Sequence, residues 1–325
     1  MTHSVSGCEQ AARAIIRDYT APWASQIQED AVGNLMVCEN LQENGIMLAA
    51  HMDEIGLMVN YISEDGLLHV CKVGGISIPM YFGQMVRIFT SKGMIYGSVS
   101  VKRDLYKDSK ISDILIDIGA KDKKDAETYV SVGDVITFDS DCHDLLNGRI
   151  CGRNMDDKTG IYVIMEALRR AKEKGLRSSV AAVATVGEET TQDGAMWSAS
   201  RLKPRLAIIV DVTYTSDHPH GSKPEDYGDI RLGCGPAICI NPIINRKHIK
   251  ELQNISEKHN IHLQYETSVS NTCTDADRIH YANNGVEVLL VSIPLRYMHA
   301  AGEIADTKDI EDCVTLILEY LLTHI

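Results

Sequence analysis

The chain has 325 residues, 44% of them hydrophobic and 24% charged, and its 45 acidic and 32 basic residues give a net charge of -13. A chain of this length buries a substantial core, and it is long enough for two domains or for one large domain with an insertion. The acidic excess argues against nonspecific binding to nucleic acid or to an anionic membrane, because both need a positive field.

No targeting signal is visible in the sequence, and the cysteines do not form a metal-binding or disulfide pattern, so we expect a cytoplasmic protein. The first residues include neither a basic stretch nor an apolar one, and no apolar run reaches about 18 residues anywhere in the chain. The nine cysteines form no Cys-x-x-Cys pair and are odd in number. We expect them to be reduced and mostly buried, and we do not expect a zinc site made of thiolates.

The first strong strand ends in a candidate metal ligand. A helix is predicted over residues 9–19 and a strand over 34–38, followed by the apolar strand 45–53, which ends in His51-x-Asp53. Residues two apart on a strand face the same side, so Asp53 can accept from one ring nitrogen of His51 while the other nitrogen binds a metal. Taken alone, the pair is as well explained by a hydrogen-bonded histidine at a sheet edge.

Residues 63–146 have a different pattern and predict an inserted β domain. Short alternating strands interrupted by glycine are predicted over 66–73, 85–90, 94–99, 114–118 and 134–138, with little helix between them. This spacing is typical of a small β-barrel or β-sandwich. Such an insertion can shape substrate access or carry an oligomer contact, and a passive insertion is equally allowed.

The α/β pattern resumes with Asp156-Asp157, which precede an amphipathic helix over 161–175. The commoner use of aspartate at such a position is to cap the helix. The next strand, 179–186, is rich in β-branched and small apolar residues and is followed by Glu188-Glu189. This pattern predicts a buried parallel strand, and open α/β sheets place their chemistry at the carboxyl ends of such strands. A solvated acidic loop is the alternative.

Two more strands end in candidate ligands. A short helix is predicted over 194–202, then the strand 206–213 with Asp211 near its end, and the strand 286–293 that leads to His299. Helices are also predicted over 247–259, 275–282 and 309–322, with a strand over 261–265. His218 and His220 lie in a polar loop, where histidines are most often solvated, although extra ligation or substrate contact is the alternative. Arg296 could bind substrate, but an arginine after a strand more often holds a neighbouring loop.

The strand ends together offer two imidazoles and several carboxylates, a donor set suited to zinc, cobalt or manganese. A pair of ions fits the set better than one ion, because a carboxylate can bridge two metals. Without metal, the same acids would repel one another strongly. The candidate ligands are His51, Asp156, Glu189, Asp211 and His299, with Asp53 and Glu188 beside them.

The chain resembles the glutamyl/leucyl/deblocking aminopeptidase family, and the resemblance extends over nearly its full length. The family's members are dinuclear metallopeptidases that often assemble as tetrahedral dodecamers. The resemblance rests on many short motifs in the family's order: Ser6-Gly7-x-Glu9, Gly33-Asn34-Leu35, Ala50-His51-x-Asp53-Glu54-x-Gly56, Val73-Gly74-Gly75, Asp117-x-Gly119-Ala120, Asp156-Asp157-x-x-Gly160, Glu188-Glu189 with Gly194-Ala195, Val210-Asp211-x-Thr213, Leu232-Gly233-x-Gly235-Pro236, Thr274-Asp275-Ala276 and Ile293-Pro294-x-Arg296-Tyr297-x-His299.

The resemblance implies a role for each candidate residue. Two divalent ions, zinc or cobalt with manganese as a further candidate, would share Asp156. One ion would add His51 and Asp211, and the other would add Glu189 and His299. Glu188 would be the general base that deprotonates the attacking water, and Asp53 would orient His51. The family also implies a cis peptide between Asp156 and Asp157.

The predicted fold is a three-layer α/β/α zinc-peptidase-like catalytic domain, made of residues 1–62 and 147–325, with a small inserted β-barrel over 63–146. The predicted activity is removal of N-terminal residues from short peptides by a homo-oligomer, with the tetrahedral dodecamer as one form. The segment Thr190 to Asp193 departs from the family pattern, and we expect the protein to differ from its relatives there.

Two other functions remain open from the residues. A metal-dependent deacylase acting on small amides would use the same fold and ligands. A catalytically silent peptide-binding or assembly protein would belong to another class, but the presence of every ligand and the base argues against it. A glycosidase using Glu188 would leave His51 and His299 unexplained.

Overall fold

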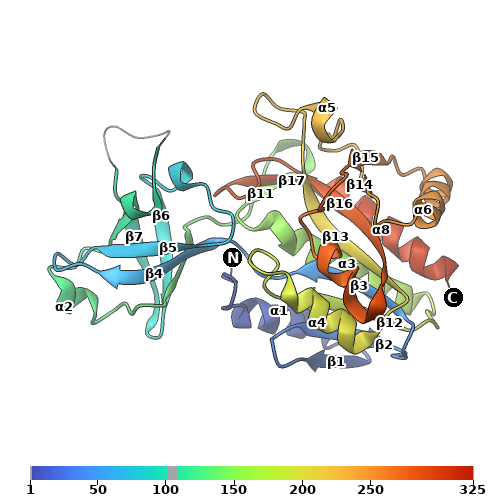
Figure 1. The fold of residues 1–325 in the computed structure, drawn as a ribbon, viewed down its shortest axis with the longest axis horizontal. Coiled ribbons are helices and arrows are strands. Elements are labelled where there is room, and N and C mark those ends of the chain that lie inside the picture. Colours follow the sequence, from blue (N-terminus) through green and yellow to red (C-terminus); the bar gives the residue numbers. More distant parts are fainter. Residues whose placement is uncertain (1, 102–107, 325) are drawn as a thin grey trace.

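The computed structural model describes residues 2–101 and 108–324, and it consists of an α/β/α body with a β-barrel projecting from one end (Figure 1). The body is built on an eight-stranded sheet in the order β1-β2-β12-β3-β13-β16-β14-β15. Its strands are β1 (Gln26–Glu29), β2 (Leu35–Glu39), β3 (Ile46–His51), β12 (Val180–Thr185), β13 (Leu206–Tyr214), β14 (Ala237–Ile240), β15 (Gln264–Thr267) and β16 (Glu287–Leu295).

The four central strands β12, β3, β13 and β16 run parallel to one another. The antiparallel strands β2 and β14 flank them. Every residue of β3 and β12 is buried, because helices cover both faces of the sheet and leave only apolar and small side chains room at its centre. The parallel strands therefore all end at one edge, as the apolar strand patterns predict.

Helices on the two faces of the sheet complete the three layers (Figure 1). On one face, α3 (Met155–Glu173) packs against the central strands and against α8 (Thr307–Thr323), which in turn contacts α6 (Arg246–His259). On the other face, α4 (Asp193–Leu202) packs with the short helix α7 (Ala276–Ile279). Helix α1 (Gln10–Thr20) lies beside α3, and α5 (Pro224–Tyr227) lies in the loop after β13. The observed layers confirm the predicted α/β fold.

The insertion is a closed six-stranded barrel in the order β4-β5-β8-β7-β6-β9. Its strands are β4 (Gly56–Ile62), β5 (Leu68–Val73), β6 (Met85–Thr90), β7 (Gly93–Val99), β8 (Leu115–Asp117) and β9 (Val135–Phe138), joined in part by the short helix α2 (Lys123–Ala126). The barrel has its own core, which includes Leu57, Ile88 and Ile116. Because the sheet closes on itself, it buries that core without a second sheet. Of the two forms that the strand spacing allows, a barrel or a sandwich, the structure has the barrel.

The barrel begins earlier than the predicted division at residues 62 and 63. Strand β4 pairs with β5 and β9, so residues 56–62 belong to the barrel although the division assigned them to the catalytic part. Since β4 follows β3 closely and is also largely apolar, only its pairing partners distinguish the two strands. The division of the chain into domains otherwise stays a prediction.

A small three-stranded sheet lies at the junction and brings distant parts of the chain to the strand edge. It pairs β10 (His143–Asp144) with β11 (Arg149–Gly152), and β11 with β17 (Glu303–Asp306). Gly152 lies opposite Glu303 in this sheet. Because β11 leads directly into α3, this pairing places the start of α3 beside the segment that follows His299.

In the part of the chain that the structure describes, no helix is long and apolar enough to cross a membrane. All nine cysteines are free thiols in the structure, as the sequence predicts, but only Cys38, Cys239 and Cys313 are buried, so the expectation that most of them are buried was wrong.

Candidate metal centre

The candidate residues converge where the central parallel strands end. His51 is the last residue of β3 and lies opposite Thr185, the last residue of β12, so the loop that carries Glu188 and Glu189 begins beside it. Asp211 lies within β13, next to β3. Asp156 lies in the first turn of α3, and His299 lies between β16 and β17.

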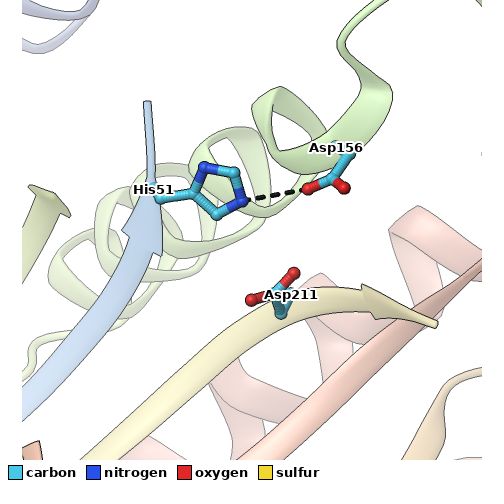
Figure 2. Close-up of side chains that lie close together, drawn as sticks. All are labelled: His51, Asp156 and Asp211. Atoms are coloured by element: carbon cyan, nitrogen blue, oxygen red, sulfur yellow. Dashed lines mark hydrogen bonds and ion pairs between the residues drawn. The ribbon is translucent and has the colours of Figure 1, made fainter. Parts of the chain in front are cut away.

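His51, Asp156 and Asp211 form the first group of candidate ligands. One ligand atom from each lies within 4.8 Å of those of the other two, and all three residues are buried. His51 Nε2 is 2.9 Å from Asp156 Oδ1, and Asp211 approaches from the neighbouring strand (Figure 2). Burial by itself would lower the pKa of His51, but hydrogen bonds with Asp156 and Asp53 raise that pKa well above its usual value.

Asp156, Glu189 and His299 form a second group that meets the same distance limit. His299 Nε2 lies 3.2 Å from Asp156 Oδ2 and 3.4 Å from Glu189 Oε1. Burial would lower the pKa of His299, but these two carboxylates raise it to about 12. Asp156 thus belongs to both groups and turns one carboxylate oxygen toward each imidazole, which is the arrangement that a bridging ligand needs.

Most of the contacts between Asp53 and the site involve backbone groups, which the sequence did not suggest. His51 Nδ1 is 3.1 Å from the backbone oxygen of Asp53 and 3.5 Å from its Oδ1. The Asp53 carboxylate accepts hydrogen bonds from the Ser6 hydroxyl at 2.6 Å and from the backbone N–H groups of Glu188 and Glu189 at 3.1 and 3.2 Å. Asp53 therefore contacts the His51 ring and also fixes the backbone of the acidic pair.

The two aspartates before α3 have different surroundings, and the peptide between them is cis. The Asp157 carboxylate accepts hydrogen bonds from the backbone N–H of His51 at 3.3 Å and of Gly160 at 3.0 Å. The helix-capping interpretation of the pair therefore applies to Asp157, while Asp156 points toward the histidines.

Glu188 lies at the margin of the first group rather than within it. Its Oε2 is 4.0 Å from His51 Nε2, and its Oε1 accepts a hydrogen bond from the Gln192 amide at 2.9 Å. Burial, together with the nearby carboxylates Asp275 and Glu189, raises the pKa of Glu188 to about 8. Glu188 and Glu189 thus reach different partners from adjacent positions, Gln192 and His299 respectively, but they do so from a turn and not from the extended chain that the sequence suggested.

The negative charge of the buried carboxylates favours the binding of divalent cations at this site. Burial raises the pKa of Asp211 well above its usual range, and the carboxylate of Asp157 adds to that shift. Burial raises the pKa of Glu189 in the same way. Cations held by the two groups would neutralise these acids, and oxygen and imidazole nitrogen are the donors that zinc, cobalt and manganese accept. The residues therefore fit a pair of divalent metal ions.

Glu303 is a supporting residue that sequence reasoning missed. It is buried, and its carboxylate accepts hydrogen bonds from the backbone N–H groups of Met155 at 2.7 Å, Asp156 at 3.2 Å and His299 at 2.7 Å. It thereby ties the start of α3 to the loop of His299. Its position four residues after His299 gives no signal in the sequence, because the contact depends on the pairing of β11 with β17.

The inserted barrel also reaches the site, through the loop after β5. The backbone oxygen of Gly75 lies 3.0 Å from His299 Nδ1, and a Cβ added at Gly75 would come within 3.2 Å of the His299 ring. The glycine-rich motif at residues 73–75 marks this loop in the sequence, but its contact with His299 requires the barrel to be in place.

The remaining candidates lie outside the two groups. The His218 ring packs against Tyr297 with their centres 5.0 Å apart, and its Nδ1 accepts the backbone N–H of His220 at 3.3 Å. Neither histidine belongs to the candidate metal groups among the described residues. Arg296 donates to the carboxylate of Asp217 at 2.9 and 2.7 Å, so it holds a neighbouring loop, as expected.

Comparisons with known proteins point to one family. Residues 33–316 match the family model described as M42 glutamyl aminopeptidase. The chain is 34% identical to the lysyl aminopeptidase of Pyrococcus furiosus over 324 residues, which cover 96% of this chain and 91% of that protein.

Solved structures agree with the sequence comparison. The TET aminopeptidase of a marine sediment Thaumarchaeota archaeon superimposes with a TM-score of 0.91 and 31% identity, covering 98% of this chain and 93% of that one. The Pyrococcus horikoshii TET1 peptidase, described as assembling into a tetrahedron or a large octahedral shell, superimposes with a TM-score of 0.86 and 29% identity, covering 99% and 96% of the two chains.

Proposed function

Because the chain belongs to the M42 glutamyl aminopeptidase family and is therefore a metallo-aminopeptidase, we propose that it removes N-terminal residues from short peptides with a pair of divalent metal ions. The observation that carries this proposal is the position of Asp156, whose two carboxylate oxygens face His51 and His299 respectively. We assign His51 and Asp211 to one ion, Glu189 and His299 to the other, and Asp156 to both. Zinc or cobalt, and manganese as a third candidate, suit these ligands.

When bound, the ions would supply Lewis-acid chemistry that polarises the scissile carbonyl and makes the attacking water more acidic. Glu188 then takes the proton of the attacking water and passes it to the leaving amine. Its position supports this role, since it is buried beside the first group yet outside both groups, so its lone pairs are not needed for ligation. Asp53 and Glu303 hold the backbone segments that carry Glu188, Asp156 and His299.

The same family relationship supports a homo-oligomer, in which the tetrahedral dodecamer is the form we propose first. The barrel projects from the catalytic body (Figure 1) and is a natural place for contacts between subunits or for control of substrate access. A cytoplasmic location stays a prediction.

Two substitutions and a chelator test the catalytic assignment. Glu188→Gln should keep both metals but lower kcat at least about 100-fold, because it removes the proton acceptor without removing a ligand. Asp156→Ala should lose metal and activity together. Metal content would be measured by mass spectrometry, and activity with a panel of aminoacyl chromogens before and after chelation and after return of zinc, cobalt or manganese.

The controls in this panel separate the alternatives. N-acylated chromogens, which lack the free amine, would be the better substrates of a deacylase. A chain that binds metal but cleaves no member of the panel would be the silent relative. Full activity of the Glu188→Gln variant would overturn the role assigned to Glu188, and full activity after complete metal removal would overturn the metal mechanism.

A further inference from the structure

The loop that joins β12 to α4 is a compact turn that holds Glu188 by its backbone. The backbone oxygen of Gly187 accepts hydrogen bonds from the N–H groups of Thr190, Thr191 and Gln192 at 3.3, 2.9 and 2.7 Å. On the opposite side, the N–H groups of Glu188 and Glu189 donate to Asp53. The main chain on both sides of Glu188 is therefore fixed, and what remains free is the rotation of its side chain.

Gln192 restricts that rotation. Its side-chain amide donates to Glu188 Oε1 at 2.9 Å, and the other carboxylate oxygen, Oε2, lies 4.0 Å from His51 Nε2. One oxygen is thus held by the loop while the second faces the candidate metal groups. Glu188 is largely buried, so this hydrogen bond competes little with water.

The local structure does not otherwise require glutamine at position 192. The residue precedes α4 in the left-handed conformation, with φ of 59°, and its side chain makes no capping hydrogen bond to the helix. Glutamine is not among the preferred N-cap residues, which are Ser, Thr, Asp and Asn. The contact with Glu188 is the interaction that accounts for this side chain.

We infer that Gln192 is a positioning residue for hydrolysis, which keeps the Glu188 carboxylate turned so that Oε2 faces the attacking water. The inference rests on the proposed role of Glu188 as the base. A primary amide neither takes nor gives up a proton in this chemistry, so Gln192 acts only through the orientation of its neighbour. Orientation matters because a base must lie within hydrogen-bond reach of the proton that it removes, and small displacements of catalytic groups are costly.

Gln192→Met tests the inference, because methionine has nearly the same length and shape but cannot donate. We expect kcat to fall about tenfold while KM, metal content and melting temperature stay unchanged. Gln192→Glu should lower kcat further, since it sets a second carboxylate against Glu188. Thr191→Val is the matched control in the same loop, with an exposed side chain that does not hydrogen-bond Glu188, and it should keep the wild-type kcat.

A double-mutant cycle distinguishes positioning from a general disturbance of the loop. In an enzyme that already carries Glu188→Ala, adding Gln192→Met should change the residual kcat less than about twofold, because the group that Gln192 orients is gone. An equal tenfold loss in both backgrounds would overturn the inference, and so would a loss of metal from the Gln192→Met enzyme.

The remaining outcomes separate this inference from the proposed function. A Gln192→Met enzyme with wild-type kcat, beside an inactive Glu188→Gln enzyme, would refute the role of Gln192 and leave Glu188 as the base. An active Glu188→Gln enzyme would refute both.

Discussion

Asp156 is the residue on which the two ligand groups depend, since it is the member that they share. Its pKa lies well below the usual range, because hydrogen bonds with His299 and His51 outweigh the effect of burial, which would raise it. Asp156 belongs to a recognisable sequence motif, but its orientation is set by residues that lie outside the motifs. Glu303 is the main one, since it binds the backbone of both Asp156 and His299.

Glu303→Gln should therefore weaken metal binding although Glu303 is not a proposed ligand. The carboxylate accepts three backbone N–H groups, and an amide would turn a donor toward at least one of them. We expect roughly tenfold weaker binding of metal, measured by competition with a chromogenic chelator, and a free energy of unfolding lower by about 2 kcal/mol. Glu64→Gln, at an exposed position in the barrel, is the control and should leave metal affinity unchanged. Unchanged metal affinity in the Glu303 variant would show that Glu303 does not support the site.

At the scale of elements, the loop after β5 connects the barrel to the metal centre. The Gly75 oxygen faces His299 Nδ1, so a proton on that nitrogen can be donated to the barrel loop while Nε2 faces Asp156 and Glu189. A barrel inserted between β3 and the rest of the sheet can thus contribute to the site without supplying a ligand.

Gly75→Ala tests this connection. The added methyl group would come 3.2 to 3.3 Å from the His299 ring, so the ring or the loop must move. We expect the ion assigned to His299 and Glu189 to bind about tenfold more weakly, seen as a second, weaker step in a calorimetric metal titration. Met80→Ala, at an exposed position in the following segment, should leave the titration unchanged. Two unaltered binding steps in the Gly75 variant would contradict a role for the barrel loop.

A second contact between elements joins α1 to α3 through Glu166. The buried Glu166 carboxylate accepts hydrogen bonds from Arg169, from Tyr19 of α1 and from Arg170. The hydrogen bonds from Arg169, and then those from Tyr19 and Arg170, lower the pKa of Glu166 to about 2. A carboxyl whose pKa is lower in the folded than in the unfolded chain stabilises the fold above its unfolded pKa and loses that effect as the pH falls toward its folded pKa.

Glu166→Gln should accordingly lower the free energy of unfolding by about 2 kcal/mol at pH 7. The difference from wild type should shrink as the pH falls below about 4.5 toward 2, because the wild-type carboxyl becomes protonated in the unfolded chain first. Urea unfolding at a series of pH values measures this difference in the free energy of unfolding. Glu173→Gln removes a more exposed ion pair to Arg169 and should change stability by less than about 0.5 kcal/mol. A difference for Glu166→Gln that is independent of pH would contradict this account.

For the whole molecule, the quantity to measure is the mass of the assembly. Multi-angle light scattering of the 35.9 kDa chain should give a multiple of the subunit mass, and twelve subunits if the tetrahedral form is adopted. A monomer at micromolar concentration would refute the proposed oligomer, while a dimer would refute the dodecamer alone.

Much of the architecture was predictable because it depends on local patterns. The buried strands β3, β12, β13 and β16 are continuous apolar runs, and parallel strands buried on both faces must have that composition. The acids and histidines that follow these runs could be picked out for the same reason, since their positions in the chain fix which edge of the sheet they reach.

Other features depended on pairings between distant segments. The assignment of β4 to the barrel, the support of Asp156 by Glu303 and the contact of Gly75 with His299 follow from strand pairing and domain packing. Likewise, residues 190–193 could be recognised as unusual from the sequence, but the hydrogen bond from Gln192 to Glu188 needed the folded loop.

The sequence by itself determined the class of fold, the family and the candidate ligands, because apolar periodicity and the order of motifs are carried by neighbouring residues. Only the tertiary structure decided which oxygen of Asp156 faces which histidine, and which buried groups hold the ligands in place, because those contacts join residues up to 224 positions apart in the chain. No local pattern encodes a hydrogen bond to a backbone group that another strand brings into reach.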